Sequence, residues 1–340
     1  MNTKRNVLII LGFLLAIGIL FYIKNSYTRE SSSGARVEFA VEHPEQVRQI
    51  FMTNKDGTKQ VRLVKQDDGS WVLNNQYLAW QKKIDLLLTE TMAKVKVKNP
   101  APVTAVDNVI TKMAIQGIKV EIYTSNLRMP SETFVVGGTT VDLMGTYFMH
   151  ENEKPQVVHI PGFDGYLSSR FSLEEDDWIS HTIFGSTPEE ILAIHIDYPA
   201  DSVGSFRIKN KDGIPDFTSR VTTPLINMAA VKSYLNFFEK LNYEGFEKSR
   251  SVVFLDSLKA SQPYCIIRVI SLNRGEEELK VYKKQTDDRT KSLYDKEGQE
   301  LVEDTDRYYA VYSKLPKRLL FVQDYTFSKV FVRSSEFYLP

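Results

Sequence analysis

An uninterrupted apolar run from Val7 to Ile23 is the feature that most constrains this chain, because such a segment is not stable in water. At about 1.5 Å per helical residue, its 17 residues span roughly 26 Å, which is near the thickness of a bilayer core. Lys4 and Arg5 precede the run, and positive charge stays on the cytoplasmic side. The sequence therefore predicts a single-pass protein of the inner (cytoplasmic) membrane, with residues 1–6 cytoplasmic, 7–23 transmembrane and the body periplasmic.

A cleaved signal peptide is the alternative interpretation of this run. Signal peptides have an apolar core of about 7 to 15 residues and a small-x-small cleavage site close behind it. The nearest such pattern, Ser33-Gly34-Ala35, lies well beyond the apolar run. We therefore favour an uncleaved anchor, followed by a flexible Ser-rich stalk over residues 24–35.

The remaining chain has the composition of a folded body. Apolar residues make up 42% of the sequence, and its length favours two domains or one duplicated fold. Lys plus Arg and Asp plus Glu are 43 each, so the formal net charge is zero, which argues against nucleic acid as a partner. The single cysteine, Cys265, lies among β-forming residues and is interpreted as a buried small apolar residue rather than a nucleophile.

Strand patterns alternate with helix patterns along the body, which predicts an α+β fold with antiparallel sheets. Short strands separated by Asp-Gly turns open it, and a helix is expected from Trp80 to Met92. The apolar face of that helix has the spacing of three and four residues that is typical of amphipathic helices. The residues on this face are Ile84, Leu87, Leu88, Thr91 and Met92.

The second half of the body repeats the pattern of the first. Ile50 aligns with Ile194 at an offset of 144 residues, and Ile122 aligns with Val269 at 147. Further aligned pairs are Ile84 with Val231, Tyr147 with Tyr309, and Val157 with Leu319. We expect two tandem, duplicated α+β units over residues 36–186 and 187–340. The alternative is a chance alignment of two unrelated α+β segments.

No constellation typical of catalysis or metal binding is present in the sequence. The histidines are too scattered for a metal-ligand motif, and no nucleophile elbow or phosphate-binding loop occurs. These histidines are His43, His150, His159, His181 and His195. The acidic run from Glu174 to Asp177 is interpreted as a solvated helix start. We expect no enzymatic activity, no cofactor and no metal.

Aromatic residues crowd around the helix that is expected in the second unit. They are too many for one helical face to bury, and Tyr and Phe contribute strongly to binding surfaces. The candidates for an interaction surface are Tyr234, Phe237, Phe238, Tyr243 and Phe246. Packing in the core is the other interpretation and the favoured one.

Several motifs in their order along the chain resemble the bacterial family filed as domain of unknown function 4340. They include Trp71-Val72-Leu73, Gly145-Thr146-Tyr147 and Val158 to Phe163. The motif residues interpreted as structural are Gly137, Gly138, Thr139, His159, Pro161, Gly162 and Asp164. The resemblance implies one N-terminal span, an extracytoplasmic α+β region, and a place beside auxiliary components of gliding-motility-type ABC transporters. It implies no catalytic residues.

Together these features predict a non-enzymatic accessory or scaffold protein of a membrane complex. Its expected partners are the bilayer, through Val7 to Ile23, and subunits of an ABC-type transport system. An anchor raises the effective concentration of the body beside other embedded subunits, so a weak interface suffices. The alternative function is a periplasmic ligand-binding module for a glycan or a peptide.

Overall fold

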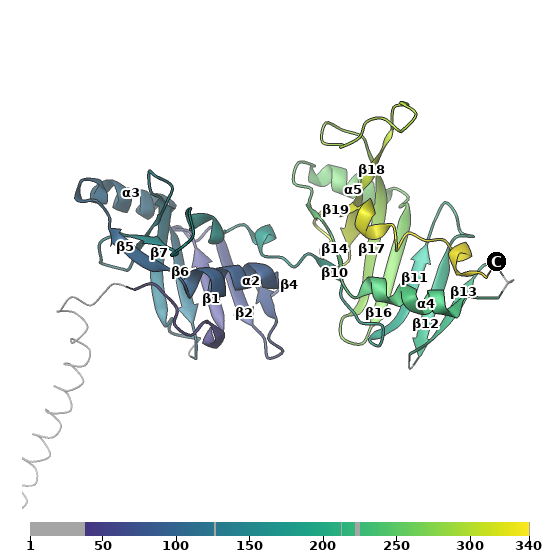
Figure 1. Ribbon diagram of the computed structural model, residues 1–340, viewed down its shortest axis with the longest axis horizontal. Helices are drawn as coiled ribbons and strands as arrows, with labels where there is room; N and C mark the ends of the chain where they lie inside the picture. Colours follow the sequence, from purple (N-terminus) through teal and green to yellow (C-terminus); the bar gives the residue numbers. More distant parts are fainter. Residues whose placement is uncertain (1–37, 126, 212, 222–224, 340) are drawn as a thin grey trace, which may run out of the picture. The chain divides into compact units, whose positions relative to one another are not determined.

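The computed structural model describes residues 38–339, except 126, 212 and 222–224 (Figure 1). The predicted membrane span, 7–23, and the stalk, 24–35, lie outside the described residues. None of the helices in the described part is long and apolar enough to cross a membrane. The chain divides into two compact units, the first ending at Trp178 and the second starting at Ile179.

The first unit is built on a nine-stranded sheet in which every neighbouring pair is antiparallel. The order across it is β4-β3-β2-β1-β6-β7-β8-β9-β5. Its strands are β1 Gln49–Thr53, β2 Gln60–Lys65, β3 Trp71–Leu73, β4 Tyr77–Leu78, β5 Lys96–Pro100, β6 Ile118–Tyr123, β7 Glu132–Thr139, β8 Thr146–Met149 and β9 Gln156–His159. Its helices are α2 Gln81–Leu87, which continues as a π-helical turn over Leu88–Met92, and α3 Val106–Gln116.

The second unit is built on an eight-stranded antiparallel sheet in the order β13-β12-β11-β16-β17-β18-β19-β15. Its strands are β11 Ile191–Asp197, β12 Phe206–Lys211, β13 Ile214–Ser219, β15 Gly245–Phe246, β16 Cys265–Ser271, β17 Gly275–Gln285, β18 Glu303–Tyr312 and β19 Leu320–Gln323. A separate pair is formed by β10 Thr182–Phe184 and β14 Leu241–Asn242. Its helices are α4 Met228–Leu235, α5 Val252–Ala260 and α6 Asp324–Phe327.

The local sequence explains both kinds of element. On β1, Ile50 and Met52 point to one face and are fully buried, as the two-residue period of a strand requires. All five residues of the predicted apolar helix face, from Ile84 to Met92, are buried. Helix α3 approaches β7 so closely that a Cβ added at Gly137 would lie 2.6 Å from Cγ of Met113. The predicted α+β fold with antiparallel sheets is thus confirmed.

The two sheets share one order of elements. In each, a meander is followed by a helix, a short edge strand, a second helix and four further strands. Ile50 pairs with Ile122 across β1 and β6, and Ile194 pairs with Val269 across β11 and β16. The aligned residues Ile50 and Ile194, and likewise Ile122 and Val269, therefore occupy equivalent places in the two sheets.

The structure differs from the sequence analysis at two points of this organisation. The division falls after Trp178 and not after residue 186, because Thr182–Phe184 pairs with Leu241–Asn242 of the second unit. In the last hairpin, Tyr147 pairs with Val157, whereas Tyr309 pairs with Phe321 and not with Leu319. The aligned position there is shifted by two residues, since the β18–β19 turn is longer.

Candidate functional site

The structure places most of the predicted aromatic surface in the core of the second unit. Tyr234, Phe238 and Tyr243 are buried, and the Tyr234 hydroxyl donates a hydrogen bond of 2.8 Å to the carbonyl of Val330. The interpretation of these three as an interaction surface is therefore wrong, and the core interpretation holds. Only Phe237, 38% exposed, and the half-buried Phe246 keep access to solvent.

The motif residues of the first unit occupy turns and close contacts. Gly137 and Thr139 lie in β7, and His159 lies in β9 opposite Lys96. Gly162 has a φ of 81° in the turn that follows β9. The remaining residues of the motif, Gly138, Pro161 and Asp164, are exposed.

The other groups considered from sequence also have structural places. Cys265 is buried, and burial raises the pKa of its thiol to about 12, so the thiolate is disfavoured. Lys59 pairs with Glu174 at one end of the acidic run, and Ser172, just before the run, donates to Asp177 at the other end. Within the described part of the chain, His, Cys, Asp and Glu form no group that could hold a metal ion.

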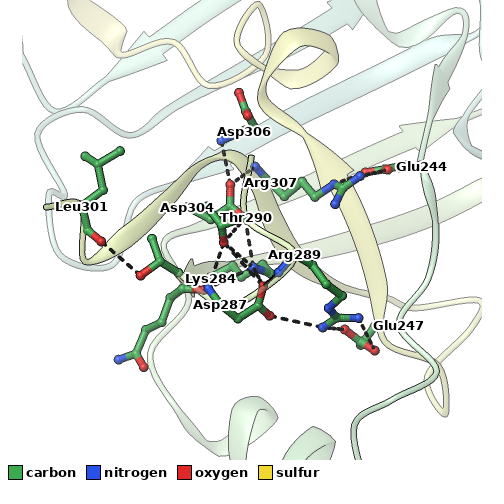
Figure 2. Close-up of polar contacts among 12 residues, drawn as sticks. Glu244, Glu247, Lys284, Asp287, Arg289, Thr290, Leu301, Asp304, Asp306 and Arg307 are labelled. Atoms are coloured by element: carbon green, nitrogen blue, oxygen red, sulfur yellow. Dashed lines mark hydrogen bonds and ion pairs between the residues drawn. The ribbon is translucent and has the colours of Figure 1, made fainter. Parts of the chain in front are cut away.

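The most elaborate polar arrangement in the second unit surrounds Lys284, near the end of β17. Its side chain is only 1% exposed, yet its ammonium group is fully engaged. Nζ donates to Asp304 Oδ2 at 2.9 Å, to Asp287 Oδ1 at 3.0 Å and to Thr290 Oγ1 at 3.2 Å (Figure 2). Lys is seldom buried unless it is paired, so these contacts are what make the burial tolerable.

Asp304 completes the centre of this arrangement from the start of β18. Its Oδ1 accepts the backbone N–H groups of Asp306 and Arg307 at 2.9 and 3.1 Å. Its Oδ2 accepts the Thr290 hydroxyl at 3.1 Å in addition to Lys284. The carboxylate thus joins the two strands to the segment that connects them.

Two arginines extend the arrangement outward, as Figure 2 shows. Arg289 Nη2 donates to Glu247 Oε2 at 2.7 Å and to Asp287 Oδ2 at 3.2 Å, and the Glu247 side chain is fully buried. Arg307 forms a two-pronged contact with Glu244 at 2.8 and 2.5 Å. Such forked pairs are among the stronger polar contacts in proteins.

The paired groups of this cluster keep one another in their charged forms. Burial acts to raise the pKa of Asp287, but hydrogen bonds from Lys284 and Arg289 outweigh it and lower that pKa to about 2. Burial acts to lower the pKa of Lys284, and its hydrogen bonds to Asp304 and Asp287 reverse the direction and raise it. Both groups are therefore ionised at neutral pH. A paired lysine of this kind is a structural anchor and not a nucleophile.

The anchored segment is the connection between β17 and β18, residues 286–302, which we call the arm. Its base is closed by the Thr286 N–H, which donates to the carbonyl of Val302 at 3.0 Å, and by the Leu301 N–H to Leu293 at 2.8 Å. Asp295 caps the turn at its tip by accepting the N–H groups of Glu297 and Gln299. In Figure 1 the arm extends beyond the end of β18.

The arm carries apolar side chains into solvent. Leu293 is 45% exposed, Tyr294 61% and Val302 73%. The equivalent connection of the first unit, residues 140–145 between β7 and β8, is much shorter. It also exposes apolar residues, Val141, Leu143 and Met144. Because the fold closes this position with six residues in one unit, the 17 residues of the arm are an addition that the sheet does not require.

Sequence reasoning missed the arm and its anchor. The signal was a long polar stretch between two strand patterns, from Gln285 to Glu303, with an Asp-Lys-Glu-Gly turn inside it. Glu247 lies 42 residues from Arg289 of the arm, and Glu244 lies 63 residues from Arg307 of β18, so only the fold brings these partners together. The chain matches no family model, no curated protein and no solved structure.

Proposed function

We propose that this chain is a membrane-anchored, non-enzymatic accessory protein that binds subunits of a membrane complex through the arm. The observation that carries the proposal is the arm itself, a long addition with exposed Leu293 and Tyr294 held on a buried ionic base. Exposed apolar and aromatic side chains on a fixed segment are typical of protein interfaces. The apolar run from Val7 to Ile23 supplies the anchor.

The kind of complex is proposed from the family resemblance. The resemblance to the family filed as domain of unknown function 4340 supports a body in the periplasm, beside an ABC-type export system of the gliding-motility kind. A second contact surface is the β7–β8 connection, where Leu143 adopts a φ of 60° that is uncommon for a residue other than glycine. Two weak contacts made by one anchored chain give a higher overall affinity than either contact alone.

We further propose that the two units arose by internal duplication. The shared order of strands and helices and the matching pairs Ile50–Ile122 and Ile194–Val269 support it. In this account, the first unit retains the short connection and the second gained the arm. Gain of a loop on a retained scaffold is a common way in which new binding surfaces arise.

The test is recovery of partners with the full-length chain from membranes in mild detergent. Two comparisons are needed, residues 1–35 alone and a full-length variant in which residues 292–300 are replaced by Asn-Gly. That replacement leaves Lys284, Asp287, Thr290 and Asp304 in place. Recovery of transporter subunits by the full chain, with loss in both comparisons, supports the proposal. Recovery of the chain alone, or unchanged recovery without the arm, contradicts it.

A further inference from the structure

A hollow of about 390 Å³ lies at one end of β11, β12 and β13 in the second unit, remote in sequence from the arm. Its volume falls at the small end of the range of ligand pockets, which is about 300 to 1,000 Å³. The residues that line it are mostly polar, and they come from the three strands and from the 198–205 connection. They include Asp197, Ser202, Ser205, Arg207, Thr218 and Arg220.

Strand register places the charged residues of the hollow on one face. Arg207 pairs with Thr218 across β12 and β13, and Arg220 follows Thr218 by two residues, so the three side chains share a face. Arg207 also pairs with His195 of β11, which puts Asp197 on that face. Two guanidinium groups and a hydroxyl are thus directed to one side of the sheet.

The balance of charge in the hollow is positive. Its acidic member, Asp197, is held by Arg268 at 3.1 Å, and Arg268 is not among the lining residues. Arg220 donates to Ser202 Oγ at 3.1 Å, which fixes the guanidinium against the connection. Arg207 is exposed, and among the described residues its guanidinium has no hydrogen bond or ion pair. An exposed guanidinium with free donors beside a second arginine is an arrangement that binds oxyanions.

The first unit offers a direct comparison at the same position. Arg62 is the counterpart of Arg207, since Leu63 pairs with Ile50 as Ile208 pairs with Ile194. Its guanidinium is already occupied, because it lies 4.9 Å from the centre of the Phe51 ring and donates to Gln49. The second unit has replaced these contacts by an open, polar hollow.

We propose that this hollow binds a small polar molecule through a phosphate group, with Arg207 and Arg220 as its two cationic contacts. Thr218 donates a further hydrogen bond to the same group, and the remaining volume accepts a body of the size of one sugar. Arginine forks bind both carboxylates and phosphates, and a phosphate offers more acceptor oxygens and more negative charge to two guanidinium groups and a hydroxyl on one face. The phosphate belongs to a soluble sugar phosphate or to a lipid headgroup, two sources that share this chemistry.

The experiment is calorimetric titration of the full-length chain in phosphatidylcholine nanodiscs with glucose 6-phosphate, and with glucose as the neutral control. The variants are Arg207→Gln and Arg220→Gln, with Arg62→Gln as the matched control on the first unit. We expect saturable binding of the phosphate only, weakened about tenfold or more by either variant in the hollow and unchanged by Arg62→Gln. Circular dichroism of each variant establishes that the fold is retained.

The source of the phosphate is resolved by a second set of nanodiscs that contain phosphatidic acid. Competition with glucose 6-phosphate that depends on Arg207 and Arg220 assigns the site to a lipid headgroup, and no competition assigns it to a soluble ligand. The proposal is overturned if neither glucose 6-phosphate nor phosphatidic acid binds. It is equally overturned if glucose binds as well as its phosphate, or if Arg62→Gln has the effect of Arg207→Gln.

Discussion

The ammonium nitrogen of Lys284 lies 2.9 Å from a carboxylate oxygen of Asp304, and both side chains are 1% exposed. This pair joins the end of β17 to the start of β18 and fixes the base of the arm. An arm that is fixed at its base has fewer conformations to lose when a partner binds, which lowers the entropic cost of binding. The contact therefore links the fold of the second unit to the function that we propose.

Replacing Lys284 by Met is expected to lower the free energy of unfolding by about 3–5 kcal/mol, because Asp304 is left buried without its partner. Chemical unfolding of the full-length chain in detergent, followed by circular dichroism, measures this. The matched control is Lys283→Met, which removes an ion pair with Glu303 between side chains that are 40% and 51% exposed. It is expected to cost about 1 kcal/mol or less. Equal losses in the free energy of unfolding in the two variants would show that the buried Lys284–Asp304 pair stabilises the fold no more than an exposed ion pair does.

The stability contributed by Asp287 is expected to depend on pH. Its pKa is about 2 in the folded chain, below the ordinary value of 3.8. A carboxyl group with a lowered pKa stabilises the fold above its ordinary pKa, and the contribution is lost as the pH falls through the folded pKa. The difference in free energy of unfolding between wild type and Asp287→Asn should thus shrink between about pH 4 and pH 2. A difference that grows on acidification would contradict the assignment.

Two adjacent glycines of β7 provide a test of the packing of the first unit. A Cβ at Gly137 would lie 2.6 Å from Cγ of Met113, whereas a Cβ at Gly138 meets no atom within 4 Å. Gly137→Ala is therefore expected to destabilise the chain by about 1–3 kcal/mol through overpacking against α3. Gly138→Ala should leave the unfolding midpoint nearly unchanged. The reverse order of the two variants would rule out the close approach of α3 to β7.

Neighbouring phenylalanines after α4 test the corrected assignment of the aromatic cluster. Phe238 is fully buried and Phe237 is 38% exposed. Phe238→Ala is expected to cost about 3–5 kcal/mol, and Phe237→Ala clearly less. Thermal unfolding of the two variants makes the comparison. If Phe237→Ala had the larger effect, the assignment of Phe238 to the core would be wrong.

Local patterns in the sequence were sufficient for much of the fold. The helix face from Ile84 to Met92 was predicted correctly, because periodicity reports which residues are buried in a strand or helix. The alignments of Ile50 with Ile194 and of Ile122 with Val269 were also correct. Apolar Phe39 and Val41 alternate with other residues ahead of β1, yet residues 38–41 form no strand. Single backbone hydrogen bonds, such as the one that the Val41 N–H donates to the Met92 carbonyl, join these residues to the first unit in place of strand pairing.

The rest of the fold and the site depends on contacts that are distant in sequence. Tyr234 looked too crowded to bury on one helix, but the C-terminal segment covers it, with the ring of Phe337 at 5.3 Å. The anchor of the arm draws on Glu247, Lys284 and Asp304, which no local period connects. Ion pairs between residues so far apart in sequence depend on the tertiary fold. Local periodicity in the sequence therefore cannot predict them.

The most direct test of the proposed function is site-specific photo-crosslinking from the arm in intact membranes. A photoreactive residue is placed at Tyr294, which is 61% exposed, and as a control at Ile214 on β13, which is 72% exposed. We predict a crosslinked product between position 294 and an integral membrane subunit of a transport complex, none from position 214, and a lower yield when Lys284→Met loosens the base of the arm. Absence of a product from position 294, or equal products from both positions, would contradict the assignment of the arm as the contact surface.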